Sequence, residues 1–269
     1  MGKQVIVDCI TFYNENFLTN LRFEILDEFV DFFVICESKY DHQGNKKKLN
    51  FKLINKKFAK KIRYIVIDEQ FPNPKNGWDC EKFQREKLLS GLNEANDNDY
   101  IMYSDSDEIP NPDLLKSISL RGKYGIFLQK VFVYKLNIYN SYETPWEGTR
   151  ICKKKYLKSF TYLRKKILKK NLTKPFWKFF TEKKIDIFQS GGWHFNNLYT
   201  ADVISEKLKA SPHKEFSSIE YSSVDRIREK ISNLEDLYKR GHKYNKVDID
   251  KSYPNFILKN LNLMSDYIL

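Results

Sequence analysis

Two aspartates one residue apart, Asp105 and Asp107, follow a short apolar run that begins at Tyr100. The run predicts a buried strand, and Pro110 ends regular structure just beyond it. Because side chains alternate along an extended backbone, both carboxylates are expected on the same side of the chain. Oxygen ligands suit Mg²⁺ or Mn²⁺, which usually complete their shell with substrate phosphates and water. The spacing therefore indicates a strand-end metal site for a nucleotide diphosphate. An acidic turn that caps a helix starting near Asp113 is the alternative.

Strands and helices alternate through the first part of the sequence. Apolar runs predict strands, and helical spacing of apolar residues predicts helices between them. The expected strands are residues 4–11, 32–36, 62–67 and 100–103, and the expected helices are 17–29 and 78–93. Short connections between such elements are typical of an α/β fold with a doubly wound, mostly parallel sheet flanked by helices. Ligands of such sheets bind outside the carboxyl ends of the strands, so the polar residues there are expected to line one crevice.

The later part of the sequence is less regular. Residues 124–139 alternate well enough for one or two strands, and apolar residues recur with helical spacing from 222 to 241. Neither an internal repeat nor a second core is evident. We therefore expect a single domain over residues 1–269.

Composition and charge narrow the classes of function. The 269 residues carry a net charge of +12, and 41% of them are hydrophobic, which indicates a folded globule with a possible anionic partner. Only nine of the 47 basic residues are arginine, the residue that proteins prefer for bidentate contacts with bases and phosphates. We therefore expect no nucleic-acid partner, although a Lys-rich nucleic-acid-binding protein stays an alternative.

The cysteines and the apolar runs bear on the compartment. Cys9, Cys36, Cys80 and Cys152 are widely spaced and form no Cys-x-x-Cys pair, so we expect reduced, structural thiols. A strand predicted almost at the N-terminus leaves no room for a signal peptide, and no apolar stretch approaches the roughly 18 residues of a transmembrane helix. These features favour a cytoplasmic protein.

A basic and aromatic segment, residues 163–180, suggests a place on the inner face of a membrane. Its lysines could face anionic headgroups while Phe176, Trp177, Phe179 and Phe180 face acyl chains. Such contact would be peripheral and would suit a lipid-linked acceptor. The alternative is a solvated helix followed by an aromatic strand packed in the core.

Several motifs, in this order, resemble glycosyltransferase family 17, the family of the bisecting β-1,4-N-acetylglucosaminyltransferases. They are Phe12-Tyr13-Asn14-Glu15, Arg22, residues 34–38, 78–85 and 103–110, Gly192-Trp193-His194-Phe195 and residues 211–215. The most specific is Ser-Asp-Ser-Asp-Glu-Ile-Pro. The resemblance implies a GT-A fold, a UDP-sugar donor (UDP-GlcNAc first), Mn²⁺ or Mg²⁺, and inversion at the anomeric carbon. It also implies a nucleotide-sugar-binding half, residues 1–115, and an acceptor-binding half with C-terminal helices, residues 116–269.

The resemblance implies nucleotide contacts for five residues. Thr11 and Glu15 at the first strand end, with Glu37 and Ser38 at the second, would contact uracil and ribose. Arg85 would approach the diphosphate from its helix. The alternatives are a helix cap at Glu15, an edge charge at Glu37, and a solvated salt bridge on its own helix for Arg85.

The resemblance also implies a metal site. Asp105 would touch the ribose or the metal, Asp107 would bind the metal, and His194 would complete the metal or diphosphate site. His213 competes with His194 for that role. A packed histidine is the alternative for His194, and a helix entry is the alternative for His213.

An inverting transferase needs a base for the acceptor hydroxyl. We favour Glu147, because Trp146-Glu147-Gly148 places a carboxylate beside an aromatic face that could stack on a sugar. Glu108 is the second candidate. An ordinary turn glutamate and a charge at a helix N-terminus are the respective alternatives.

These inferences predict a metal-dependent inverting glycosyltransferase that transfers a sugar from a UDP-sugar to a glycan or lipid-linked saccharide, with GlcNAc as the first candidate sugar. A sugar-1-phosphate nucleotidyltransferase is the nearest rival, but that class generally opens with a Gly-rich phosphate loop, and Thr11 to Glu15 contain no glycine. A haloacid-dehalogenase-type phosphatase normally carries its Asp-x-Asp after the first core strand, whereas here it follows the fourth.

Overall fold

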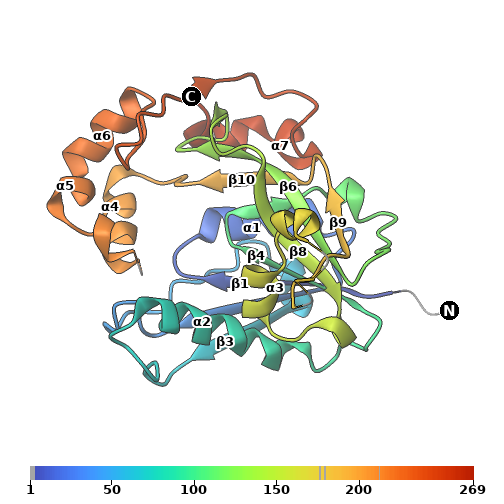
Figure 1. Cartoon of the computed structure of the whole chain (residues 1–269). Coiled ribbons are helices and arrows are strands. Elements are labelled where there is room, and N and C mark those ends of the chain that lie inside the picture. Colours follow the sequence, from blue (N-terminus) through green and yellow to red (C-terminus); the bar gives the residue numbers. More distant parts are fainter. Residues whose placement is uncertain (1–3, 176, 179, 212) are drawn as a thin grey trace.

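The computed structural model describes residues 4–175, 177, 178, 180–211 and 213–269. Four parallel strands form the first half of its sheet, in the order β3-β2-β1-β4 (Figure 1). They are β1 (Ile6–Phe12), β2 (Phe32–Ser38), β3 (Ile62–Ile67) and β4 (Tyr100–Asp105). All four lie where apolar runs predicted strands. Their parallel pairing and the helices on both faces confirm the expected α/β fold, and the later strands make the sheet mixed.

The later strands extend the same sheet beyond β4. The strand β8 runs antiparallel between β4 and β6, and β6 also pairs in parallel with β9 and β10. Their bounds are β5 (Glu108–Pro110), β6 (Tyr124–Val133), β7 (Ile138–Tyr139), β8 (Trp146–Lys153), β9 (Ile185–Phe188), β10 (Gly192–Asn196) and β11 (Asn245–Lys246). The short β5 pairs antiparallel with β10, so that His194 lies opposite Glu108. This pairing joins the Asp-x-Asp segment to a strand more than 80 residues later in the chain.

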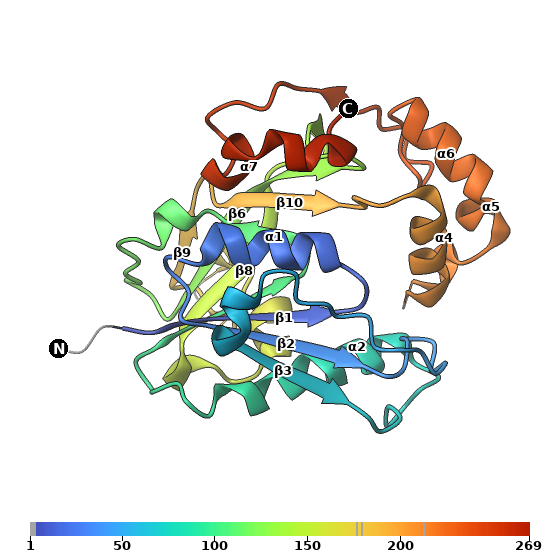
Figure 2. The ribbon, with the colours of Figure 1, turned by 180° about the vertical axis from the view of Figure 1, so that it is seen from behind.

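The two faces of the parallel strands carry separate cores. On β1, Ile6, Ile10 and Phe12 belong to the core that contains α1 (Asn16–Leu26), whereas Val7 and Cys9 belong to the core beneath α2 (Gly77–Lys87) and α3 (Phe160–Lys166). This division follows from the alternation of side chains along a strand. Figure 2 shows α1 alongside β1 from behind. All four cysteines are buried and unpaired, as expected.

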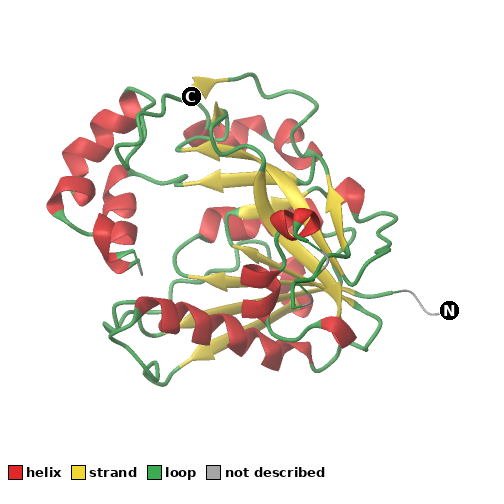
Figure 3. Cartoon of the chain, viewed as in Figure 1, coloured by secondary structure: helices red, strands yellow, loops and turns green. Residues whose placement is uncertain are grey.

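Three of the C-terminal helices pack apart from the helices that flank the sheet, whereas the last one packs against a sheet-flanking helix (Figure 3). The helices α4 (Ala201–Ala210) and α6 (Val224–Ser232) share a third core with the end of β6. The short α5 (Ile219–Ser222) contacts both of these helices, and α7 (Asn255–Lys259) contacts α1. Short 3₁₀ helices span Lys56–Lys61, Leu88–Leu92, Pro112–Leu114, Lys154–Tyr156, Lys169–Thr173, Lys214–Phe216 and Leu261–Tyr267. Within the described ranges, none of the helices has the length and apolar character needed to cross a membrane.

The expected helix over 222–241 is wrong beyond Ser232. The chain turns there, and Leu234 has a φ of +55°. Asp236 then accepts hydrogen bonds from the backbone amides of Tyr238 and Arg240, which stabilises a loop in place of further helical turns. Leu234 and Leu237 still pack in the third core, but they reach it from this loop. The helix expected over 78–93 likewise changes to 3₁₀ geometry after Lys87.

Candidate active site

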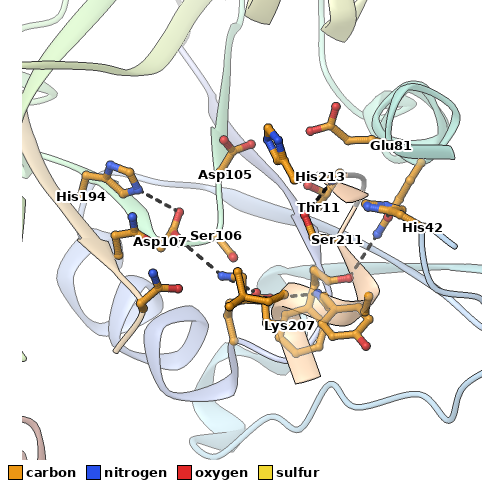
Figure 4. A pocket seen from close by; sticks show the side chains of 18 of the residues that line it. Thr11, His42, Glu81, Asp105, Ser106, Asp107, His194, Lys207, Ser211 and His213 are labelled. Atoms are coloured by element: carbon orange, nitrogen blue, oxygen red, sulfur yellow. Dashed lines mark hydrogen bonds and ion pairs between the residues drawn. The ribbon is translucent and has the colours of Figure 1, made fainter. Parts of the chain in front are cut away.

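A cavity of about 340 Å³ opens where β1 and β4 end, and α2 and α4 complete its wall (Figure 4). This volume is in the range of small-ligand sites. The predicted site residues that line it are Thr11, Glu15, Asp105, Asp107, His194 and His213. The predicted residues absent from its described lining are Glu37, Ser38, Arg85, Glu108 and Glu147. The strand-end rule therefore predicted the edge of the sheet at which this cavity opens, although several of the predicted residues do not line it.

Asp107 lies among positive groups at one side of the cavity. Its Oδ1 is 3.5 Å from Nε2 of His194, and its Oδ2 is 3.9 Å from Nζ of Lys207. The Lys207 ammonium also lies 3.4 Å from Oε1 of Glu15. Burial opposes ionisation of Asp107, but His194 and Lys207 outweigh it and hold the pKa of this carboxyl well below its usual range. In the same pair, Asp107 overcomes the effect of burial and raises the pKa of His194.

The prediction that Asp105 and Asp107 share one side of an extended strand is wrong. The strand β4 ends at Asp105, and Ser106 and Asp107 form a turn before β5 begins. The backbone amide of Phe195 in β10 donates to the carbonyl of Asp107 at 2.8 Å and fixes this turn. Both carboxylates still line the cavity, but from different backbone geometries.

Asp105 is held by a chain of polar side chains. Its Oδ2 lies 2.5 Å from Nη2 of Arg164, and its Oδ1 accepts a hydrogen bond of 3.2 Å from the hydroxyl of Tyr103. Nε of Arg85 in turn donates to that hydroxyl at 2.9 Å. Arg85 is buried and forms an ion pair with Glu81, so it lies one residue behind the cavity wall.

Glu108 is buried next to the cavity. Its carboxylate accepts from Nε1 of Trp146 at 2.6 Å and from Nη2 of Arg164 at 2.8 Å. Its side chain has no solvent exposure, because these groups enclose it. Arg164 thus bridges the two acidic residues, Asp105 and Glu108. It comes from α3, and its sequence context of lysines gave no signal for this role.

Arg22 of α1 contacts both ends of the segment from Ser104 to Glu108, which carries Asp105 and Asp107. Its guanidinium forms two hydrogen bonds with Asp8, at 2.5 and 2.7 Å, and a third with Oγ of Ser104 at 2.9 Å. It also donates to the carbonyl of Glu108. The Arg22 side chain is fully buried, so a charged residue on α1 sets the two ends of the turn that carries Asp107.

Glu37 and Ser38 have local partners. Glu37 is buried and accepts from Nζ of Lys47 at 2.6 Å, from the hydroxyl of Tyr64 at 2.7 Å, and from backbone amides of the 47–51 loop. Oγ of Ser38 accepts from the amide of Tyr40 at 2.9 Å. The structure thus uses Glu37 to attach a loop to the sheet, and does not bring it to the cavity.

Of the remaining candidates, Glu147 lies outside the described cavity lining and His213 is part of it. The Glu147 carboxylate accepts from the amide of Lys169 at 3.1 Å and lies 3.5 Å from Arg150. His213 lies at the rim, where its ring is 4.7 Å from that of Trp78. Pro212, which belonged to the helix-entry alternative, lies outside the described residues.

The cavity also contains residues that the sequence did not single out. His42, Lys207, Asn196 and Asn197 lie outside the motifs named above, whereas Glu81 and Gln84 lie in the 78–85 motif but had no predicted role in the site. They come from loops, helix faces and the end of β10, where polar residues are common. The sequence therefore offered no local signal for them.

The donor atoms fit a divalent cation that takes part of its shell from a substrate. Across the described ranges, no group of three or more His, Cys, Asp or Glu side chains is placed to hold a metal on its own. Asp107 and His194 nevertheless present oxygen and nitrogen ligands side by side, with Asp105 on the same wall. Buried Nδ1 of His194 has no hydrogen-bond partner in the described structure. Such a partial ligand set suits Mn²⁺ or Mg²⁺ that shares a nucleotide diphosphate.

The basic and aromatic segment 163–180 is only partly regular. It contains the end of α3 and a 3₁₀ helix, and Trp177 and Phe180 are exposed instead of packed in the core. Phe176 and Phe179 lie outside the described residues. The suggested membrane contact stays a prediction.

A family model described as glycosyltransferase family 17 matches residues 2–246. The chain belongs to this family. Over 118 residues it is 30% identical to beta-1,4-mannosyl-glycoprotein 4-beta-N-acetylglucosaminyltransferase of Rattus norvegicus and of Homo sapiens. Each of these alignments covers 40% of this chain and 22% of the relative, so the chain matches about a fifth of the relatives' length.

Solved structures of low similarity complete the comparison. HddC from Yersinia pseudotuberculosis, complexed with GMP-PN, is 10% identical, with 69% of this chain and 90% of that chain covered and a TM-score of 0.36. Glucosyl-3-phosphoglycerate synthase from Mycobacterium tuberculosis, in complex with Mn²⁺, UDP and phosphoglyceric acid, is 11% identical, with 95% and 91% covered and a TM-score of 0.33. At these scores the likeness supports no conclusion about ligands or chemistry.

Proposed function

We propose that this family 17 glycosyltransferase transfers a sugar from a UDP-sugar to a glycan or lipid-linked saccharide, with GlcNAc as the first candidate sugar. The transfer would invert the anomeric carbon and would depend on Mn²⁺ or Mg²⁺. The observation that carries the proposal is the meeting of Asp107, His194 and Lys207 in a cavity at the carboxyl ends of the parallel strands. The similarity to beta-1,4-mannosyl-glycoprotein 4-beta-N-acetylglucosaminyltransferase supports the choice of GlcNAc.

Different residues would stabilise the departing diphosphate in different ways. Asp107 and His194, with Asp105, would hold the cation, which when bound supplies Lewis-acid stabilisation of the leaving group. Lys207 presents its ammonium to the same space from α4 and would bind a phosphate oxygen. Arg164 compensates the charge of Asp105, so that the acidic wall does not repel an anionic donor.

The acceptor base stays a prediction. Neither Glu108 nor Glu147 belongs to the described lining of the cavity. Of the two, Glu108 contacts cavity residues, since it accepts from the amide of Asp105 and from Trp146, whose ring lies 5.0 Å from that of His194. An acceptor would have to displace Arg164 from Glu108 before this carboxylate could take its proton.

The proposal is tested by a screen of UDP-, GDP- and CMP-sugars with and without Mn²⁺, in which the thermal midpoint and the released nucleotide are measured. We expect UDP-sugars to raise the midpoint only with the metal, and Asp107→Asn to remove the metal-dependent part of the shift. Asp113→Asn, a change of an exposed aspartate just beyond β5, is the matched control and should behave like the wild type.

Two results would contradict the proposal at different points. If no UDP-sugar stabilises the wild-type protein with metal, the proposed donor is wrong. If Asp107→Asn keeps the metal-dependent shift, the donor stands but Asp107 is not a metal ligand.

A further inference from the structure

The side of the cavity opposite His194 carries a histidine whose hydrogen bonding is fixed by its neighbours. Figure 4 places His42 and Glu81 at one side of the cavity and His194 and Asp107 at the other. With the diphosphate near Asp107, we place the nucleoside of the donor on the side near His42. The inference below therefore depends on the proposed function.

The amide of Gln84 has only one possible orientation. Its Nε2 lies 3.1 Å from the carbonyl oxygen of Phe12 and 2.9 Å from that of Cys36. Carbonyl oxygens only accept hydrogen bonds, so the NH₂ group must face them. Gln84 is buried, and the exchange of its O and N atoms would leave two buried carbonyls facing an oxygen. Its Oε1 is therefore an acceptor directed away from the sheet.

The orientation of Gln84 determines the tautomer of His42. Nε2 of His42 lies 2.8 Å from Oε1 of Gln84. Because the amide oxygen can only accept, the proton of the imidazole must be on Nε2. Burial lowers the pKa of His42 and so favours the neutral ring. In a neutral ring with the proton on Nε2, Nδ1 carries a lone pair and accepts hydrogen bonds.

Nδ1 of His42 is available to a ligand. No described residue forms a hydrogen bond with it, and His42 is part of the cavity lining. Tyr13 and Trp78 also line the cavity and are only partly buried, so their rings can contact a planar base. The site thus combines aromatic surfaces with one hydrogen-bond acceptor of fixed position.

We propose that His42 is a specificity-determining residue that accepts a hydrogen bond at Nδ1 from the imino N–H of the donor's nucleobase. Uracil carries such a donor at N3, whereas cytosine has an acceptor there, which would face the lone pair of Nδ1. Guanine carries an equivalent N–H at N1, so this contact alone excludes cytosine and adenine. Gln84 is the positioning residue, because it keeps the imidazole in this tautomer.

The test compares nucleotide affinities by calorimetry on the full chain with Mn²⁺. We expect UDP to bind the wild-type protein at least about 10-fold more tightly than both CDP and N3-methyl-UDP, since the mismatched ligand leaves buried polar groups unpaired. In His42→Leu, the affinity for UDP should fall by about 10-fold, and the ratio of the affinities for UDP and N3-methyl-UDP should fall toward one. His242→Leu, the same change outside the cavity, should keep the wild-type ratios.

Each outcome decides between the two proposals. Equal binding of UDP and N3-methyl-UDP by the wild type overturns the role of His42 and leaves the proposed function intact, and this comparison needs no variant to fold. An unchanged ratio in a folded His42→Leu overturns it as well. If GDP binds better than UDP, the proposed uridine donor is wrong. The acceptor role of His42 would still be supported if N1-methylation of GDP weakens its binding to the wild type and His42→Leu removes that difference. If no nucleotide binds, both proposals fail.

Discussion

Lys207 faces the cavity between two carboxylates, and this position makes it the clearest single residue to change. Without a ligand its ammonium balances Glu15 and Asp107. With a diphosphate bound, the same ammonium would be free to bind a phosphate oxygen, because the cation would compensate Asp107. Its contribution should therefore appear in nucleotide affinity more than in folding.

We expect Lys207→Met to weaken UDP binding with Mn²⁺ by about 10-fold, or roughly 1.4 kcal/mol, when measured by calorimetry. Methionine keeps the length of the side chain and removes the charge. Lys209→Met, on an exposed position of the same helix, should bind UDP like the wild type. Equal affinities of the two variants would exclude Lys207 from the diphosphate site.

At the level of single residues, sequence reasoning found the side chains that follow apolar runs and missed those that arrive from elsewhere. Asp105, Asp107 and Glu15 stand directly after or close behind strands, and they line the cavity as expected. Arg164 and Lys207 lie in Lys-rich helices, where a functional cation looks like a solvated one. Only long-range packing distinguishes them.

Among the elements, α1 covers the sheet and also holds the turn between β4 and β5 through Arg22. Its Arg22 carries a buried charge into the core, where Asp8 neutralises it and where Ser104 and the carbonyl of Glu108 use the remaining donors. The rigidity of the turn between β4 and β5 therefore depends on a helix that does not itself line the cavity at this residue.

This arrangement predicts that stability and activity can be separated. Arg22→Met alone should lower the free energy of unfolding in urea by about 3–5 kcal/mol, because it leaves Asp8 as an unpaired buried charge. The double change Asp8→Leu and Arg22→Met should recover most of that loss, since apolar pairs often replace buried ion pairs without cost. Sugar transfer should stay impaired in the double variant, because Ser104 and the Glu108 carbonyl still lack their donor.

The opposite result has a clear meaning. If the stable double variant transfers sugar at the wild-type rate, the contacts of Arg22 with the turn are dispensable and its role is confined to the core. The single change Asp8→Leu serves as the control, since it leaves the arginine unpaired in turn.

Elements were predictable where one physical rule dominates. Strands β1, β2 and β4 are almost entirely buried, because helices cover both faces of the sheet there, and they stand out as apolar runs; the edge strand β3 is partly exposed but is still an apolar run. The helix expected to continue past Ser232 fails because a loop held by Asp236 places Leu234 and Leu237 in the same core at helix-like spacing. The three-residue β5 is too short for a pattern, so its pairing with β10 could not be inferred.

In the whole molecule, the C-terminal segment closes over the first helix. The rings of Phe17 and Tyr267 stack with centroids 3.5 Å apart, and the carbonyl of Tyr267 accepts from the amide of Leu136 at 2.7 Å. Residues near both described ends of the chain thus share one core with the central strands.

We expect Phe17→Ala and Tyr267→Ala to be coupled in a double-mutant cycle by about 0.5–1.5 kcal/mol of unfolding free energy. Phe17→Ala with Tyr142→Ala, whose ring stacks on His242 instead, should be additive. Additive effects of the first pair would show that the stack contributes no specific energy to docking of the C-terminal segment.

The contact between Gln43 and the carbonyl of Ser211 spans 168 residues, and it has a consequence for the chain during its synthesis. At translation rates of about 5–20 residues per second, roughly 10 to 30 s separate the appearance of these two residues. During that interval the parallel strands can already pair, but the wall that α4 supplies does not yet exist. A nascent chain, or one terminated before α4, therefore has a partly formed sheet without a complete crevice, and we expect it not to consume donor sugar until α4 has been made.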